Sequence, residues 1–96
     1  MTYKIKVLDI FLNQIKDLDK KSKDIIKEKI DLIKENPFRF KRIHSRLFTK
    51  VFRVRLNIQR RESRLIYVVL KPNVILVCLL SRKNDYKDLE KYLKKI

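Results

Sequence analysis

The sequence predicts a small α+β domain in which an antiparallel four-stranded sheet carries a helical hairpin on one face, with a further helix at the C-terminal end. Three observations lead to this fold class. Residues 3–7 alternate apolar side chains with lysines, residues 9–35 repeat apolar side chains at helical spacing, and residues 51–80 hold three strand-like runs. A chain of 96 residues closes one core. We therefore expect a single domain over residues 1–96 in the order β-α-α-β-β-β-α.

The first half of the chain predicts one strand followed by two helices. Asp9 is the expected N-cap of the first helix, and Asp19 separates it from the second. Asn36-Pro37 ends the second helix, because the residue before a proline is disfavoured in the helical region. The apolar stripes predicted to face the sheet are Phe11, Ile15 and Leu18 in the first helix, and Ile26, Ile30 and Ile33 in the second.

The second half predicts a basic loop, three strands and a last helix. Residues 38–50 show no clean period and are expected to form a loop. Phe52, Val54 and Leu56 alternate with arginines, IQRRES is a polar hairpin connection, and the runs RLIYVVL and VILVCLL are apolar on both faces, as in interior strands. Asn84 is the expected N-cap of the last helix, whose apolar stripe is Tyr86, Leu89, Leu93 and Ile96.

The charge is unevenly distributed along the chain. The net charge is +15, and residues 38–64 hold ten Lys or Arg against a single acid, Glu62. All nine arginines fall between Arg39 and Arg82; arginine grips phosphate with a planar fork, although an arginine preference of the strands is the alternative explanation. We therefore expect a nucleic-acid-binding surface. The residues predicted to contact RNA are Lys41, Arg42, Arg46, Lys50, Arg60, Arg61 and Lys83.

Composition excludes most catalytic classes. The chain has no glycine, so it has neither a P-loop nor a dinucleotide fingerprint. A solvated or phosphate-contacting role is expected for the single histidine, His44, and the single cysteine, Cys78, is expected to be a small buried hydrophobe. We expect no metal and no cofactor. Because no apolar run approaches the length of a membrane span, a cytoplasmic protein is expected.

The remaining polar constellation consists of four arginines and a tyrosine. Arg53 and Arg55 share one face of a strand at a spacing of roughly 6.5 to 7 Å. Arg64 opens the next strand and Arg82 closes the last one, so an antiparallel meander brings them to one end of the sheet. Tyr86 follows across a tight corner. The alternatives are that the two strand-end arginines are solubilising charges and that the tyrosine begins the helix core.

In these residues the chain resembles the RelE toxins of the RelE/ParE superfamily, found in bacterial and archaeal toxin-antitoxin systems. The matching stretches are FRVRL, SRLIYVV and VILVCLLSRKNDY, preceded by two helices and KENP. The resemblance implies an endoribonuclease that cuts mRNA in the ribosomal A site, where the ribose 2'-hydroxyl attacks the adjacent phosphate without a metal. It implies that Arg64 stabilises the transition-state phosphate, that Arg82 assists the leaving oxygen and that Tyr86 orients the substrate.

The chain departs from this family at the general base. Arg53 and Arg55 stand where the best-known bacterial toxin has lysines, and arginine, unlike lysine, cannot give up its proton in proteins. The base therefore stays unassigned, and catalysis by positioning and fixed charge is the remaining route.

The resemblance also implies partners, namely a smaller, acidic RelB-like antitoxin and the ribosome with mRNA in its A site. Two other functions stay open: a non-catalytic gyrase inhibitor of the ParE type, and a basic structural RNA-binding protein.

Overall fold

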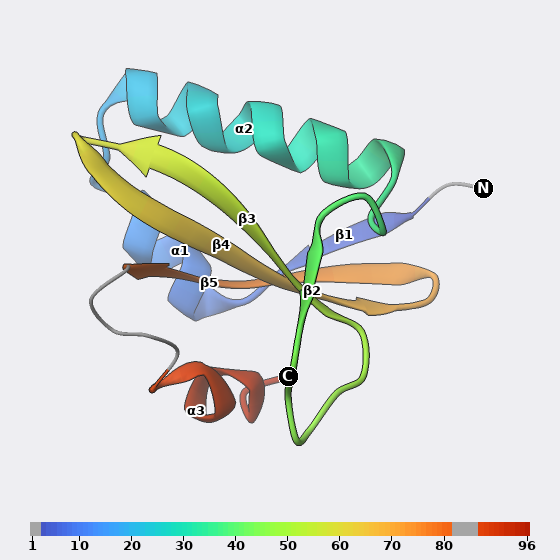
Figure 1. Cartoon of the computed structure of the whole chain (residues 1–96). Helices are drawn as coiled ribbons and strands as arrows, with labels where there is room; N and C mark the ends of the chain where they lie inside the picture. The colour runs from blue at the N-terminus through green and yellow to red at the C-terminus, as the bar shows by residue number, and fades with distance from the viewer. Residues whose placement is uncertain (1–2, 82–86) are drawn as a thin grey trace.

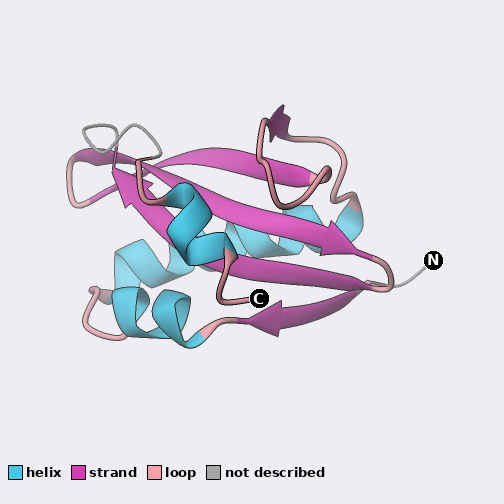
Figure 2. Cartoon of the chain, turned by 90° about the horizontal axis from the view of Figure 1, so that it is seen from below, coloured by secondary structure: helices cyan, strands magenta, loops and turns pink. Residues whose placement is uncertain are grey.

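The computed structural model describes residues 3–81 and 87–96, which form a mixed sheet with α2 on one face and α3 on the other (Figures 1 and 2). In chain order the elements are β1 (Lys4–Val7), α1 (Asp9–Ile15), α2 (Lys20–Glu35), β2 (Lys41–Ile43), β3 (Val51–Ile58), β4 (Arg61–Leu70), β5 (Asn73–Ser81) and α3 (Leu89–Leu93). The α+β class is confirmed.

The sheet has five strands in the order β1-β5-β4-β3-β2, so the prediction of four antiparallel strands was wrong in detail. The meander β3-β4-β5 is antiparallel, and β1 pairs with the outer edge of β5. This pairing is parallel, with Lys4 opposite Asn73. A period-2 pattern identifies a strand and its faces but does not fix the direction in which it pairs.

The fifth strand, β2, lies inside the segment expected to be a loop. Lys41 pairs with Arg53 and Ile43 with Val51 along the free edge of β3. A strand of three residues is too short for alternation to be visible in the sequence. The basic segment is therefore anchored to the sheet by β2, and residues 38–40 and 44–50 on either side of it are irregular.

The β3–β4 hairpin is tighter than the sequence predicted. Only Gln59 and Arg60 lie between the strands, and their φ angles are 52° and 65°. Positive φ at both central residues is the signature of a type I′ turn, which matches the twist of the flanking strands. Because pairing continues to Ile58 and Arg61, Arg64 is the fourth residue of β4 rather than its opening residue.

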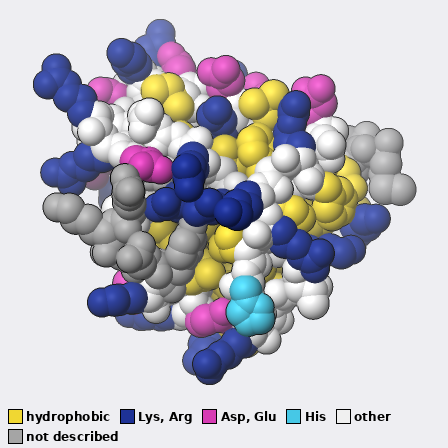
Figure 3. Space-filling view, in the orientation of Figure 1, with side chains coloured by type: hydrophobic (Ala, Val, Ile, Leu, Met, Phe, Trp, Pro, Cys, Tyr) yellow, Lys and Arg dark blue, Asp and Glu magenta, His cyan; other side chains and the backbone are white. Residues whose placement is uncertain are grey.

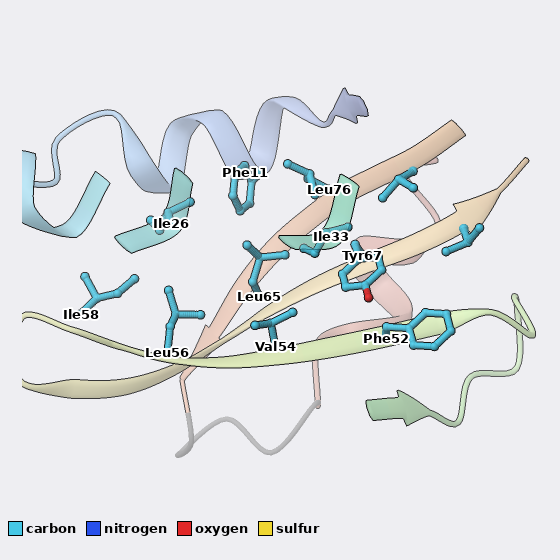
Figure 4. Packing of buried hydrophobic residues seen from close by; sticks show 12 residues of the cluster. Phe11, Ile26, Ile33, Phe52, Val54, Leu56, Ile58, Leu65, Tyr67 and Leu76 are labelled. Atoms are coloured by element: carbon cyan, nitrogen blue, oxygen red, sulfur yellow. The ribbon is translucent and has the colours of Figure 1, made fainter. Parts of the chain in front are cut away.

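The first core lies between α2 and the sheet (Figure 4). From β3 it takes Phe52, Val54, Leu56 and Ile58, which alternate along the strand as predicted. The helices contribute Phe11 from α1 and Ile26 and Ile33 from α2. The remaining fully buried members are Leu65, Tyr67, Val69, Val74 and Leu76.

The second core lies on the opposite face, under α3. Leu89 and Leu93 of α3 pack on Val51, Ile66, Val68, Ile75, Val77, Cys78 and Leu80. Ile96, predicted to continue the helix stripe, is exposed, because α3 ends at Leu93. The predicted N-cap Asn84 and stripe residue Tyr86 lie outside the described residues.

Of the two aspartates predicted at the starts of helices, Asp19 is an N-cap and Asp9 is not. Asp19 precedes α2, and its Oδ1 accepts a 2.8 Å hydrogen bond from the backbone N–H of Ser22. At α1 the N-cap is Leu8, and Asp9 is the first helical residue, where a carboxylate still favours the positive end of the helix dipole.

None of the helices in the described residues combines the length and the apolarity that crossing a bilayer requires.

Candidate nucleic-acid interface

Arg53, Arg55, Glu62 and Arg64 lie on one face of the β3–β4 hairpin, and we call this set the arginine face. Arg55 is directly opposite Arg64 in the register, and Arg53 is two residues along the same strand face. This is the sheet face that carries α3, opposite the first core. Figure 3 shows Lys and Arg side chains across the part of the surface where β3 and β4 lie in Figure 1.

The two opposed arginines differ in their exposure. The side chain of Arg55 is 61% exposed, whereas that of Arg64 is only 9% exposed. A buried guanidinium has lost most of its hydration and is fixed in direction, so it acts as a preorganised positive charge. The sequence placed Arg64 at the opening of its strand, with a solubilising charge as the alternative, whereas β4 begins at Arg61 and the Arg64 side chain is buried.

The sequence analysis missed Glu62 as a member of this site. Its Oε1 lies 3.7 Å from Nε of Arg55 and 3.8 Å from Nη2 of Arg64. A signal was present in the sequence. Glu62 is the only acid in residues 38–64, and it precedes Arg64 by two positions, which puts both on one face of a strand.

Three predicted site residues, Arg82, Lys83 and Tyr86, lie outside the described residues. The register defines only where the chain leaves β5: Ser81 pairs with Ser63, and Leu80 pairs with Arg64. The last described residue of β5 is thus beside the arginine face.

Strand β2 and the residue after it form a second basic region. A hollow of about 410 Å³ is lined by Lys41, Arg42, Ile43, His44, Arg53 and Leu89, so it connects β2, β3 and α3. Nε of Arg42 donates a 2.7 Å hydrogen bond to the carbonyl of Thr49, which holds the guanidinium across the loop. The structure therefore brings two predicted RNA-contacting residues, Lys41 and Arg42, beside Arg53.

Glu90 of α3 holds this loop in place. Ser45 Oγ donates to Glu90 Oε2 at 3.2 Å, and the backbone N–H of Arg46 donates to Glu90 Oε1 at 3.0 Å. One carboxylate thus ties the loop to the helix that covers the second core.

The other predicted contact residues point to separate places. Nζ of Lys50 lies 5.8 Å from the centre of the Phe38 ring. Arg60, at the hairpin tip, lines a hollow of about 430 Å³ with Asp19 and Lys21 at the start of α2. Lys50 and Arg60 therefore lie apart from the arginine face, so the predicted contact residues do not form one patch.

Two buried groups are unsuited to proton transfer at neutral pH. Burial raises the pKa of the Cys78 thiol to about 12 and also raises the pKa of the Tyr67 hydroxyl, which donates a 2.6 Å hydrogen bond to the carbonyl of Pro37. Both side chains are core residues, as was expected for the cysteine.

Among residues 3–81 and 87–96, no three His, Cys, Asp or Glu side chains gather as a metal site would require. What the described site offers chemically is fixed positive charge, from two exposed or half-buried guanidiniums and one buried guanidinium.

No family model and no curated protein sequence matches the chain significantly. Its fold is nevertheless similar to solved structures of the E. coli toxin RelE. A double arginine-to-alanine mutant of that toxin in the free state superposes with a TM-score of 0.72 at 20% identity, over 100% of this chain and 99% of that one. The isolated E. coli RelE toxin gives a TM-score of 0.64 at 18% identity, over 97% and 99% of the two chains.

The intact E. coli RelBE toxin-antitoxin complex is also similar, with a TM-score of 0.63 at 16% identity over 84% of this chain and 96% of that one. The resemblance predicted from the sequence is therefore confirmed at the level of the fold.

Proposed function

We propose that this chain is the toxin of a toxin-antitoxin pair and acts in the cytoplasm as a ribosome-dependent endoribonuclease, with residues 1–96 as one domain. The RelE fold across the whole chain supports this proposal. The observation that carries the proposal furthest is the buried Arg64 with Arg55 directly opposite, because fixed guanidiniums are suited to a phosphate whose charge increases during reaction.

In the proposed reaction, the 2'-hydroxyl of mRNA attacks the adjacent phosphorus. The new 2'-O–P bond forms as the P–O5' bond breaks, the 2'-proton passes to a base, and the departing 5'-oxygen takes up a proton. Arg64 stabilises the charge on the nonbridging oxygens, and Arg53 and Arg55 hold the phosphate. From the resemblance, Arg82 assists the departing oxygen and Tyr86 orients the substrate.

The basic residues outside the arginine face are proposed to bind ribosomal RNA. Lys41 and Arg42 lie beside Arg53 and extend the arginine face, whereas Lys50 and Arg60 lie at other edges of the domain. Arg46, Arg61 and Lys83 complete the proposed set. A molecule held in a ribosomal cleft is surrounded by RNA, so cations on several sides are suited to that location.

The proposed protein partner is a RelB-like antitoxin. The similar E. coli RelBE structure supports this, since that protein is found in complex with an antitoxin. A net charge of +15 favours an acidic partner, and the sheet has two edge strands, β1 and β2, whose backbone groups a partner strand can pair with.

The experiment that tests the function is primer extension on mRNA bound to purified ribosomes, with and without this protein. We expect cuts at A-site codons only when ribosomes are present. Intact mRNA together with trapped gyrase cleavage complexes would instead identify an inhibitor of the ParE type. Intact mRNA without trapped gyrase complexes would favour the remaining function, a basic structural RNA-binding protein.

A further inference from the structure

Glu62 is an anion placed inside a cationic site. Glu62 and Arg64 are two residues apart on β4, so their side chains lie on the same face of the strand. In the register Glu62 is opposite Asn57, next to the pair formed by Arg55 and Arg64. Like charges directly opposite each other destabilise a sheet, so a carboxylate between the two guanidiniums offsets their repulsion.

One carboxylate oxygen makes both ion pairs. Oε1 lies 3.7 Å from Arg55 and 3.8 Å from Arg64, whereas a charge-assisted hydrogen bond between such groups has a length of about 2.7 to 2.9 Å. The Glu62 side chain is also 30% exposed. Oε1 therefore lies at a point reached by both guanidiniums, and water also reaches the side chain.

A phosphate oxygen would be attracted to the same point. It carries negative charge and accepts hydrogen bonds as a carboxylate oxygen does, and guanidiniums bind both kinds of oxo-anion. We infer that Glu62 occupies the position of a substrate phosphate oxygen between Arg55 and Arg64, and that an RNA phosphate displaces it on binding. This inference rests on the proposed binding of an RNA phosphate at the arginine face.

Two opposite effects follow from this role. With the carboxylate in place, the paired arginines are stabilised, but a phosphate must displace or repel a negative charge in order to bind. Removing the charge at Glu62 therefore raises the affinity for phosphate and slightly lowers the stability of the folded protein. If Glu62 only supported the arginines, its substitution would lower both the affinity for phosphate and the stability of the folded protein.

The test compares how tightly the wild type and Glu62→Gln bind a single-stranded RNA. This RNA carries 2'-O-methyl groups, so it cannot be cut by 2'-hydroxyl attack. Glu62→Gln keeps the size of the side chain and removes its charge. We expect it to bind this RNA about tenfold more tightly than the wild type at about 0.1 M salt, where the Debye length is about 10 Å, because a like charge next to the phosphate is removed. Melting temperatures show whether the variant is folded.

Glu28→Gln is the matched control. It changes the net charge by the same amount, but Glu28 is exposed on α2, on the opposite face of the sheet. Its affinity for the RNA should stay within about twofold of the wild type, since exposed charges beyond a Debye length are largely screened. Equal tightening in both variants would mean that net charge alone acts, and would overturn the inference.

A second measurement needs no variant. During titration of the wild type with inorganic phosphate, NMR follows the Glu62 carboxyl carbon and the Arg55 Nε–H group. Displacement predicts that both signals move with the same midpoint. An Arg55 signal that moves while the Glu62 signal stays fixed would overturn the inference.

These measurements separate the inference from the proposed function. If the wild type leaves mRNA intact on ribosomes but Glu62→Gln still binds RNA more tightly than Glu28→Gln, the nuclease proposal fails and the inference stands. If the wild type cuts mRNA but Glu62→Gln binds the RNA no more tightly than the wild type, the inference fails and the nuclease proposal stands.

Discussion

The two faces of strand β3 have opposite chemistry although they alternate residue by residue. Phe52, Val54 and Leu56 are buried against α2, whereas Arg53 and Arg55 face the side that carries α3. The long helix α2, with 16 residues, covers the first face, and the five-residue α3 covers only part of the second. One short strand thus supports the core with one set of side chains and offers the other set to a ligand.

This difference separates stability from binding in a small domain. Apolar burial on the α2 face is the main favourable term in folding. The arginine face concentrates like charges, which favours an anionic ligand and opposes folding. Substitutions on the two faces should therefore have distinct consequences.

The largest effect on stability is expected on the α2 side. Phe11→Ala empties a site that is 1% exposed and should lower the free energy of unfolding by about 3 to 5 kcal/mol. Leu12→Ala is the control, because the neighbouring side chain is 47% exposed and its loss should cost less than about 0.5 kcal/mol. Urea denaturation measures both, and equal costs would show that α1 does not pack as described.

The largest effect on activity is expected at Arg64. Arg64→Ala should slow cleavage by about 10² to 10³, the usual cost of losing one preorganised charge at a reacting group. Because Arg64 is buried and paired with Glu62, the variant should also lose about 1 to 3 kcal/mol of stability. Single-turnover cleavage and urea denaturation test this prediction, with the exposed Lys27→Ala on α2 as control.

A folded Arg64→Ala protein that cuts at the wild-type rate would remove Arg64 from the site.

The sequence predicted most of the fold but only the elements long enough to show a period. The alternation in residues 51–56 and the helical stripe of Ile26 and Ile33 led directly to the first core. Strand β2 and the parallel direction of β1 were missed, because three residues show no period and edge pairing depends on contacts far along the chain.

The candidate site was predicted as residue types and not as an environment. Arg53 and Arg55 share one face, as their spacing indicated, whereas the position of Arg64 on that same face comes from the register of the structure. The burial of Arg64 depends on the two-residue turn between β3 and β4. This turn contains no glycine, so the sequence predicted a longer polar connection in its place. Glu62 was missed because an acid in a basic segment has no motif of its own.

Substitutions in the β3–β4 turn should be able to raise the stability of the protein. Left-handed backbone costs a non-glycine residue about 1 to 2 kcal/mol, and both Gln59 and Arg60 adopt it. Replacement by the preferred pair, Gln59→Asn with Arg60→Gly, should raise the free energy of unfolding by about 1 kcal/mol. Thermal unfolding measures this, and Arg60→Ala, which removes the same charge but keeps a Cβ, is the control. A double variant no more stable than this control would contradict the turn geometry.

The smallest effect concerns the cap of α2. Hydrogen bonds from the side chain and backbone of Ser22 lower the pKa of Asp19 below its usual value of 3.8. Because the folded state favours the ionised form, this contribution to stability is present above pH 3.8 and is lost as the pH falls below it. The difference in Tm between the wild type and Asp19→Asn should shrink in that acidic range, and a difference that is constant with pH would contradict this cause.

The central claim is that the arginine face of β3 acts on RNA while its other face only holds the fold. Val54 and Arg55 are neighbours on this strand and face opposite sides of the sheet. Measuring ribosome-dependent cleavage and urea denaturation for Arg55→Gln and Val54→Ala tests the claim directly. The account predicts that Arg55→Gln loses at least about tenfold in cleavage with stability within about 0.5 kcal/mol of the wild type. It predicts that Val54→Ala loses about 2 kcal/mol of stability and keeps full cleavage. Full cleavage by Arg55→Gln, or slow cleavage by a folded Val54→Ala protein, would contradict it.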